Sequence, residues 1–196
     1  MGLKNFITGR DGSIAVEFAF IAPVMVGLFF GLSELALALG AKGDVQNLAS
    51  VGADLIAQES AASTSDMTNV FSALSAMLYP YSTSNAQITI SSVIDDKSGG
   101  TTGNANTTGK VAWSCTQGGT ARSANSTYTF PSTAQGVITS NSGGSVIMAE
   151  VTYSYSLPFT VKIANVINLS GPYALTNTFY SKPRKVSQIT GPSSCP

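Results

Sequence analysis

The organisation of this chain is set by one stretch near its start, GSIAVEFAFIAPVMVGLFFGLSELALALGA, which spans residues 12–41. Between Phe18 and Leu39 only Ser33 and Glu34 are strongly polar. At about 1.5 Å per residue, a helix over that run is about 33 Å long, enough to cross the hydrocarbon core of a bilayer. We therefore predict a transmembrane helix over residues 13–41.

The charges on either side of the apolar run predict its orientation. Lys4 and Arg10 precede the run, whereas Lys42 is the one nearby positive charge that follows it. The positive-inside rule then places residues 1–12 in the cytoplasm as a short leader and the rest of the chain outside. A secretory signal peptide cleaved near ALALGA is the alternative, although the run is longer than a usual signal core.

Composition argues against several classes of function. The chain has 196 residues, a net charge of zero and only 10% charged residues, so it has no basic surplus with which to bind nucleic acid. Histidine, the commonest general base and metal ligand, is absent. No phosphate-binding loop, dinucleotide fingerprint or Gly-x-Ser-x-Gly motif occurs. We expect no catalytic site, no metal and no cofactor.

One pair of carboxylates, Asp95 and Asp96, is the remaining candidate for hydrolytic chemistry or for Ca²⁺ binding with neighbouring carbonyls. The pair opens a run of turn-forming residues, DDKSGGTTGNANTTG. Acidic residues in that setting are typical of solvated turns, and we interpret them so.

Glu17 is the unusual residue of the apolar segment. A carboxylate inside a bilayer costs several kcal/mol, yet this one lies a single turn inside the start of the run, five residues after Gly12. The simplest interpretation is that Glu17 sits at the cytoplasmic interface and faces the lipid headgroups.

Other residues of the segment suggest contacts with neighbouring helices. Pro23 removes a backbone donor and tends to kink a helix. Gly27 and Gly31 form a Gly-x-x-x-Gly face that allows another helix to approach closely. Glycine and proline are, however, both common in membrane helices in general. Glu34 lies near the outer end, where we expect it to reach toward water or to pair with a neighbour.

The Gly12–Glu17 spacing resembles the processing site of type IV prepilins and pseudopilins. In those proteins a short charged leader ends in Gly, and Glu is the fifth residue of the mature chain. Cleavage after Gly12 would make Ser13 the new N-terminus, with Glu17 fifth and Phe18 sixth. The carboxylate of Glu17 could then neutralise the new α-ammonium of its own or an adjacent subunit, so that two costly buried charges become one pair.

The segment also resembles the N-terminal signature of the TadE-like family. The matching residues are Ala-Val-Glu-Phe-Ala at 15–19 followed by Pro23, with Gly31 and Glu34 later in the helix. Toward the C-terminus, AEVTYSYSLPF (149–159) and FYSKPR (179–184) are similar to the family's strand with alternating aromatics and its terminal Pro-Arg. Residues 60–145 carry no recognisable motif.

This resemblance implies a minor pilin or pseudopilin of a tight-adherence, Flp-type pilus. The implied partners are other pilin and pseudopilin subunits, a prepilin peptidase, the inner-membrane assembly platform and the lipid bilayer. The implied location is the bacterial inner membrane, with the N-terminus cytoplasmic and the head periplasmic.

Beyond the membrane segment the pattern predicts an α+β head. Apolar residues at helical spacing continue the first helix outside the membrane over 42–60, and a second apolar stripe predicts a helix at 65–79. From residue 87 the period becomes two, which predicts an antiparallel sheet of about four strands in the head, 61–196. The expected strands are 87–94, 110–117, 147–155 and 173–180, with loops at 96–109 and 117–145.

The oxidation state of the two cysteines, Cys115 and Cys195, depends on the compartment in which the head folds. In an oxidising one they would close a long loop and stabilise the fold by roughly 4 kcal/mol, whereas in a reducing one they would be free thiols. An outward-facing head favours the disulfide. The same topology keeps a second hypothesis open, in which a permanently anchored head binds a surface glycan or protein through the loops 96–109 and 117–145. An extracytoplasmic enzyme is a third, supported only by the Asp95–Asp96 pair.

Overall fold

A computed structural model describes residues 10–156, 161–163, 167–169 and 171–196. The chain divides into two compact units, each described here by itself: residues 1–40 with 157–170, and residues 41–156 with 171–196. One long helix, α2 (Arg10–Ala57), contributes residues to both units. The predicted long N-terminal helix is thus confirmed, and its described part begins three residues earlier than expected.

The first unit contains the apolar part of α2 and a short hairpin. Strand β5 (Val161–Ile163) pairs antiparallel with β6 (Ile167–Leu169), with Lys162 opposite Asn168. The period-two pattern of apolar and polar residues did not predict these strands, because three residues are too few to show a period. Part of the predicted leader, residues 1–9, lies outside the described residues, as do residues 157–159 of the C-terminal family-like stretch.

The second unit begins with the polar part of α2 and continues into α3 (Thr64–Met77). Helix α3 starts at a capping box: the Ser63 hydroxyl accepts from the backbone N–H of Asp66, and the Asp66 carboxylate accepts from the backbone N–H of Ser63. The helix ends before Pro80, which cannot continue it, as the sequence predicts. A 3₁₀ turn, η1 (Thr83–Asn85), leads into the sheet.

A five-stranded antiparallel sheet forms the rest of this unit, in the order β3-β2-β1-β4-β7. The four predicted strands are all present, and the short β3 extends the sheet beyond them. Their bounds are β1 (Ala86–Asp95), β2 (Thr108–Gln117), β3 (Thr127–Thr129), β4 (Ser145–Tyr155) and β7 (Tyr173–Ser181). The α+β fold class is therefore confirmed.

One face of this sheet packs against the two helices. A side chain at Gly52 of α2 would meet Leu74 of α3 as well as Ile90 of β1 and Ala149 of β4, so the helices and strands meet at this glycine. Tyr153 and Tyr155 are buried, whereas Trp113 is half-buried. The α3 stripe is buried at four positions, whereas Val70 is half-buried and Met77 is 43% exposed. The four buried positions are Met67, Phe71, Leu74 and Leu78.

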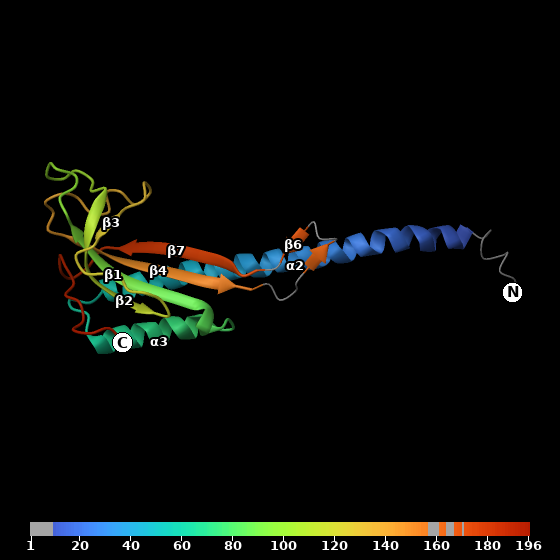
Figure 1. Ribbon diagram of the computed structural model, residues 1–196, viewed down its shortest axis with the longest axis horizontal. Coiled ribbons are helices and arrows are strands. Elements are labelled where there is room, and N and C mark those ends of the chain that lie inside the picture. The colour runs from blue at the N-terminus through green and yellow to red at the C-terminus, as the bar shows by residue number, and fades with distance from the viewer. Residues whose placement is uncertain (1–9, 157–160, 164–166, 170) are drawn as a thin grey trace. The chain divides into compact units, whose positions relative to one another are not determined.

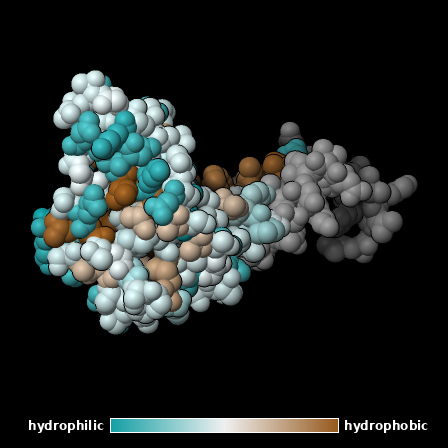
Figure 2. All heavy atoms as spheres, turned by 60° about the vertical axis from the view of Figure 1, so that its left-hand side comes forward, coloured by the Kyte–Doolittle hydropathy of each residue, from teal (hydrophilic) through white to brown (hydrophobic). Residues whose placement is uncertain are grey.

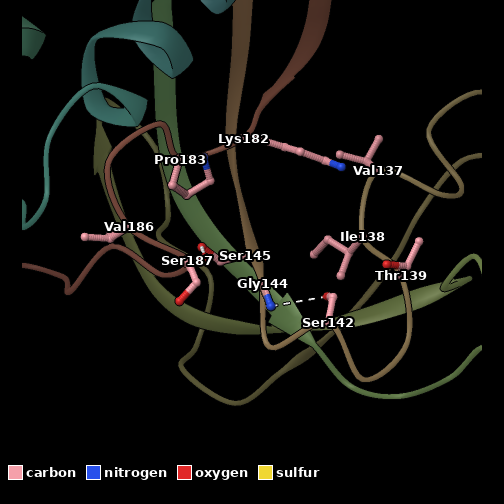
Figure 3. A pocket seen from close by; sticks show the side chains of 10 residues that line it. All are labelled: Val137, Ile138, Thr139, Ser142, Gly144, Ser145, Lys182, Pro183, Val186 and Ser187. Carbon is pink, nitrogen blue, oxygen red and sulfur yellow. Dashed lines mark hydrogen bonds between the residues drawn. The ribbon is translucent and has the colours of Figure 1, made fainter. Parts of the chain in front are cut away.

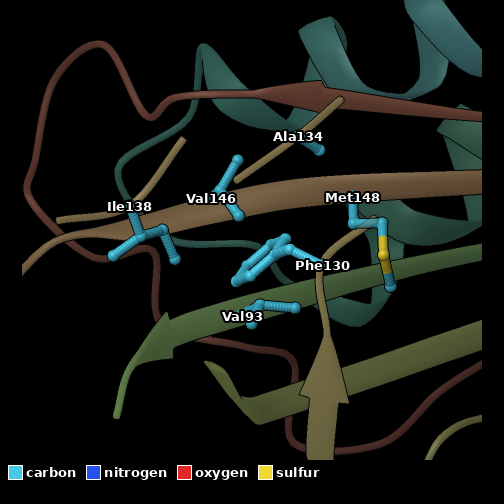
Figure 4. Close-up of a cluster of buried hydrophobic side chains, with 6 residues drawn as sticks. All are labelled: Val93, Phe130, Ala134, Ile138, Val146 and Met148. Atoms are coloured by element: carbon cyan, nitrogen blue, oxygen red, sulfur yellow. The ribbon is translucent and has the colours of Figure 1, made fainter. Parts of the chain in front are cut away.

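The opposite face carries a second apolar cluster at one end of the sheet (Figure 4). Phe130, 2% exposed, follows β3 and packs over Val93 of β1 and Met148 of β4. A Cβ on Gly109 would lie 3.1 Å from the Phe130 ring and 2.5 Å from Val93, so the absence of a side chain there makes room for the ring. The prediction that 117–145 is a loop or flexible excursion is therefore wrong in part. This segment folds back, adds β3 and closes the core.

Candidate membrane and assembly site

Between residues 14 and 32, every side chain of α2 except Ala22 is exposed. Of the residues described, this is the one helix long and apolar enough to cross a membrane, by length and composition, and its most apolar window is unburied. Phe18, Phe20 and Phe29 are 67–76% exposed. Because exposure of so much apolar surface to water is unfavourable, the helix fits a single-pass membrane anchor.

The predicted processing and pairing residues lie on the first turns of this helix. Gly12 and Ser13 have helical backbone, so the bond between them lies inside a turn close to the helix start. Glu17 and Phe18 follow on the next turns, and both are exposed. A peptidase acting after Gly12 would have to unwind that turn, and helix ends fray readily.

The helix remains continuous through Pro23. Around Gly27 and Gly31, apart from their chain neighbours and the nearby helix backbone, no described atom lies within 4 Å of where a Cβ would stand. Packing within the described chain therefore does not require these glycines. A surface without side chains at both positions is available for close approach by another helix.

Glu34 differs from its neighbours on the helix, because it is only 7% exposed. We expected this carboxylate to reach toward water or to pair with a neighbour, and the structure buries it instead of extending it into open solvent. Next to it, the Ser33 hydroxyl donates to the carbonyl of Phe29 at 2.8 Å, which satisfies that hydroxyl within the helix.

In the head, the predicted disulfide joins Cys115 to Cys195. It attaches the C-terminal tail to strand β2, and the two cysteines have a sequence separation of 80. The tail has further contacts: the Trp113 indole N–H donates to the carbonyl of Ile189 at 2.9 Å, and the Thr64 hydroxyl donates to the carbonyl of Ser194 at 2.7 Å.

The acidic pair at 95–96 organises the loop that follows it. Asp95 accepts from the side-chain amide of Asn106 at 2.7 Å, and Asp96 accepts from the hydroxyl of Thr108 at 2.6 Å. Burial acts to raise the pKa of both carboxyls, but these hydrogen bonds and those from the backbone N–H groups of Lys97 and Ser98 outweigh it and lower each pKa. Among the described residues no group of three or more acidic, Cys or His side chains could hold a metal ion.

The two predicted binding loops form one ordered structure. Asn106 is fully buried, and its side-chain carbonyl accepts from the hydroxyl of Ser140, which belongs to the other loop. A β-bridge between Ala105 and Thr139 also joins them. Figure 2 shows that the end of the head carrying these loops is covered mainly by hydrophilic and neutral residues, with isolated apolar ones between them.

A polar cluster lies on the outer face of the sheet. The Arg122 guanidinium donates to both carboxylate oxygens of Glu150, at 2.8 and 2.6 Å, and lies 5.0 Å from the centre of the Tyr128 ring. The hydrogen bonds that Arg122 donates to Glu150 raise the pKa of Arg122. Burial raises the pKa of Tyr128 and of Tyr180, whose hydroxyls are hydrogen-bonded to each other. Sequence analysis missed this cluster, since Arg122 and Tyr128 lie in the segment interpreted as a loop.

Two of the hollows formed by the described residues lie on the head. The first, of about 200 Å³, lies between the 137–145 loop and the 182–187 tail, and the Lys182 side chain extends toward Val137 across it (Figure 3). Its polar groups are hydroxyls and one ammonium, a set without a base to activate a nucleophile. The second, of about 290 Å³, lies beside β7 and is lined by Ser50, Val51, Asp54, Leu55 and Phe179.

Comparison with known proteins gives a match over the long helix α2. None of the curated proteins and none of the solved structures matches the chain. A protein-family model described as TadE-like protein matches residues 12–54, which include Gly12, Glu17, Pro23 and Gly31. Over residues 12–54, which lie within α2, the chain is therefore similar to TadE-like proteins.

Proposed function

We propose that this protein is a non-enzymatic, membrane-anchored, pilin-like subunit that takes part in the assembly of a tight-adherence pilus. The observation that carries the proposal is the Gly12–Glu17 arrangement at the start of a long exposed apolar helix, inside the segment that matches the family model. The partners we propose are other pilin and pseudopilin subunits, a prepilin peptidase and the inner-membrane assembly platform.

The apolar helix would have two environments in this role. In the inner membrane it anchors the subunit, with residues 1–12 in the cytoplasm, residues 13–41 in the bilayer and the polar continuation at 42–60 leading to the head. During assembly the same surface would pass from lipid into a bundle of similar helices. Gly27 and Gly31, which have open space around them, would allow close packing there.

Glu17 would specify the position of the subunit in that bundle. After cleavage, Ser13 carries an α-ammonium one turn before Glu17, in an apolar setting where either charge alone is costly. Pairing the two, within one subunit or between neighbours, removes both costs and fixes the axial register. Phe18 then lies beside the pair as part of the apolar surface.

N-terminal processing is tested by intact mass and N-terminal sequencing of the protein from its native membrane. We expect a mature chain that begins at Ser13. A chain that retains Met1–Gly12 would contradict the proposed processing, and it would favour a permanently anchored head that binds a surface glycan or protein.

The role of Glu17 is tested by Glu17→Leu, with Val16→Leu as the matched control. We expect Glu17→Leu to insert into the membrane normally but to be lost from sheared pilus fractions, because the α-ammonium has no partner. Val16→Leu should assemble like the parent protein. Normal incorporation of Glu17→Leu into pili would refute this mechanism.

A further inference from the structure

The two edges of the head sheet differ in how they are closed. On the β2 side, β3 pairs with residues 108–110. Beyond it, Val111 exchanges backbone hydrogen bonds with Ser126 and Asn125 of the following loop. Further along, the disulfide of Cys115 and the tail around Ile189 lie against the strand. This edge therefore has backbone partners over residues 108–111, and the side chains of Trp113 and Cys115 are linked to the tail.

The edge formed by β7 is open. From Tyr173 to Ser181 the strand pairs with β4 in continuous register without a bulge. Among the described residues, no backbone hydrogen bond joins the other side of β7 to anything. Alternate residues of an antiparallel strand direct their N–H and C=O groups to its outer side, and within the described part of the chain those of β7 have no backbone partner.

Natural proteins usually block such an edge with a proline, a charge or a bulge. Strand β7, with the sequence YALTNTFYS, contains no charged residue and no proline. The features that prevent strand addition are therefore absent from the strand itself.

A groove beside this edge fits an apolar side chain. Phe179 of β7 is 42% exposed and Leu55 of α2 is 37% exposed, and with Val51 they line a hollow of about 290 Å³. A strand added at β7 would direct every second side chain toward α2, into this hollow. Apolar residues at those positions would cover Phe179 and Leu55.

The charges just after β7 indicate which residue should precede a strand added at this edge. Lys182 and Lys185, just after β7, are exposed, whereas Arg184 is paired with Asp54. An antiparallel strand begins where β7 ends, so its N-terminal flank would lie at this positive end. An acidic residue there would be complementary, and the strand itself would be uncharged.

A second copy of this chain does not fit the site. Strand β7 runs beside residues 41–57 of α2 in the same direction (Figure 1), and the backbone N–H of Arg184 donates to the carbonyl of Ala57 where both end. Two copies joined antiparallel through β7 would point their helices in opposite directions. The positive end of one copy would then meet Gly171 and Pro172 of the other, where no acidic residue stands.

We propose that the outer edge of β7 docks an extended segment of a different subunit, which adds to the sheet as an antiparallel strand. The segment is uncharged, alternates apolar and polar residues, and follows an acidic residue. This proposal concerns the head and is independent of the role given to Glu17 and the membrane helix.

The test uses the full chain in detergent micelles and a synthetic peptide, an aspartate followed by alternating threonines and valines. Backbone amide signals are followed by NMR during titration. We expect shifts concentrated at residues 173–181, with slowed amide exchange along the outer edge. Replacing the peptide's aspartate by lysine should weaken binding.

Two matched variants locate the site. Phe179→Lys puts a charge at the groove and should weaken binding at least about tenfold, as expected when a central apolar contact is lost. Ala112→Lys puts the same charge at an exposed position on the β2 edge and should leave binding unchanged. Folding of both variants is checked by circular dichroism and by the fluorescence of Trp113.

Three results would overturn the proposal. These are the absence of peptide binding, shifts centred elsewhere on the head, and equal affinity in Phe179→Lys. Sedimentation of the free protein is a further check. A dimer that Phe179→Lys dissociates would assign the edge to a second copy instead.

Discussion

The disulfide between Cys115 and Cys195 gives a prediction whose magnitude follows from the chain topology. The bridge closes a loop across 80 residues of sequence separation. The loop-closure relation gives an entropic stabilisation of about 4.5 kcal/mol at 25 °C for a loop of that length. We expect Cys195→Ser to lower the free energy of unfolding of the head by up to that amount.

The native state should survive this change. Cys195 is exposed, and the tail keeps the hydrogen bonds of Ile189 to Trp113 and of Ser194 to Thr64. The loss should therefore arise mainly in the unfolded chain, which gains conformational freedom. The denaturant dependence of the unfolding free energy should become steeper, because a chain without the bridge exposes more surface when it unfolds.

The assay is urea unfolding in detergent micelles, followed by the fluorescence of Trp113. It is the one tryptophan of the chain, it lies in β2, and it therefore reports on the head. Parent protein, with and without reductant, is compared with Cys195→Ser. Ser193→Ala, a change in the same tail without loss of the bridge, is the control.

Reduced parent and Cys195→Ser should agree, and Ser193→Ala should match the oxidised parent. Intact mass must show a gain of two protons in the reduced parent. If the mass changes but the unfolding free energy falls by less than about 1 kcal/mol, the loop-entropy argument is wrong for this protein. An unchanged mass under reducing conditions would mean that the bridge does not form.

Two further predictions concern the loop after β1 and the helix interface. Hydrogen bonds, including that from Thr108, lower the pKa of Asp96 in the folded protein. The contribution of Asp96 to the stability of the head is therefore complete above the unfolded pKa of about 4 and is lost as pH falls through the folded value. The urea midpoint should fall below pH 4, and Asp96→Asn should lower it at neutral pH and flatten the decline; an equal pH dependence in both proteins would contradict this assignment. In α2, Gly43→Ala has open space around it and should stabilise the helix by up to about 1 kcal/mol, whereas Gly52→Val meets Leu74 at the helix–sheet interface and should destabilise the head by about 1–3 kcal/mol. Equal unfolding free energies for the two variants would show that Gly52 is not a packing contact.

Much of the local structure followed from short-range patterns. The apolar run predicted α2, and Ser63 with Asp66 and Pro80 fits the start and end of α3. Alternating residues predicted four strands within one or two positions of their observed bounds. These signals are readable because a helix or strand displays its periodicity within a few turns of its own sequence.

Local sequence patterns did not predict the structure of the segment between β2 and β4. Phe130 closes the core over Gly109, and Arg122 pairs with Glu150, but neither contact is encoded by a local period. Short strands such as β3 form because a neighbouring strand offers them partners, and their own three residues carry little preference.

For the candidate site, the sequence alone determined that one helix carries the Gly12–Glu17 spacing, the apolar surface and the Gly27–Gly31 face. Those features belong to a single continuous helix, where sequence spacing fixes spatial spacing. Only the tertiary structure decided that Glu34 is buried, that residues 125–129 pair along the β2 edge and that the β7 edge has no backbone partner among the described residues. Burial and strand order depend on contacts between residues far apart in the chain, which the free energy of the whole fold selects and no short stretch specifies.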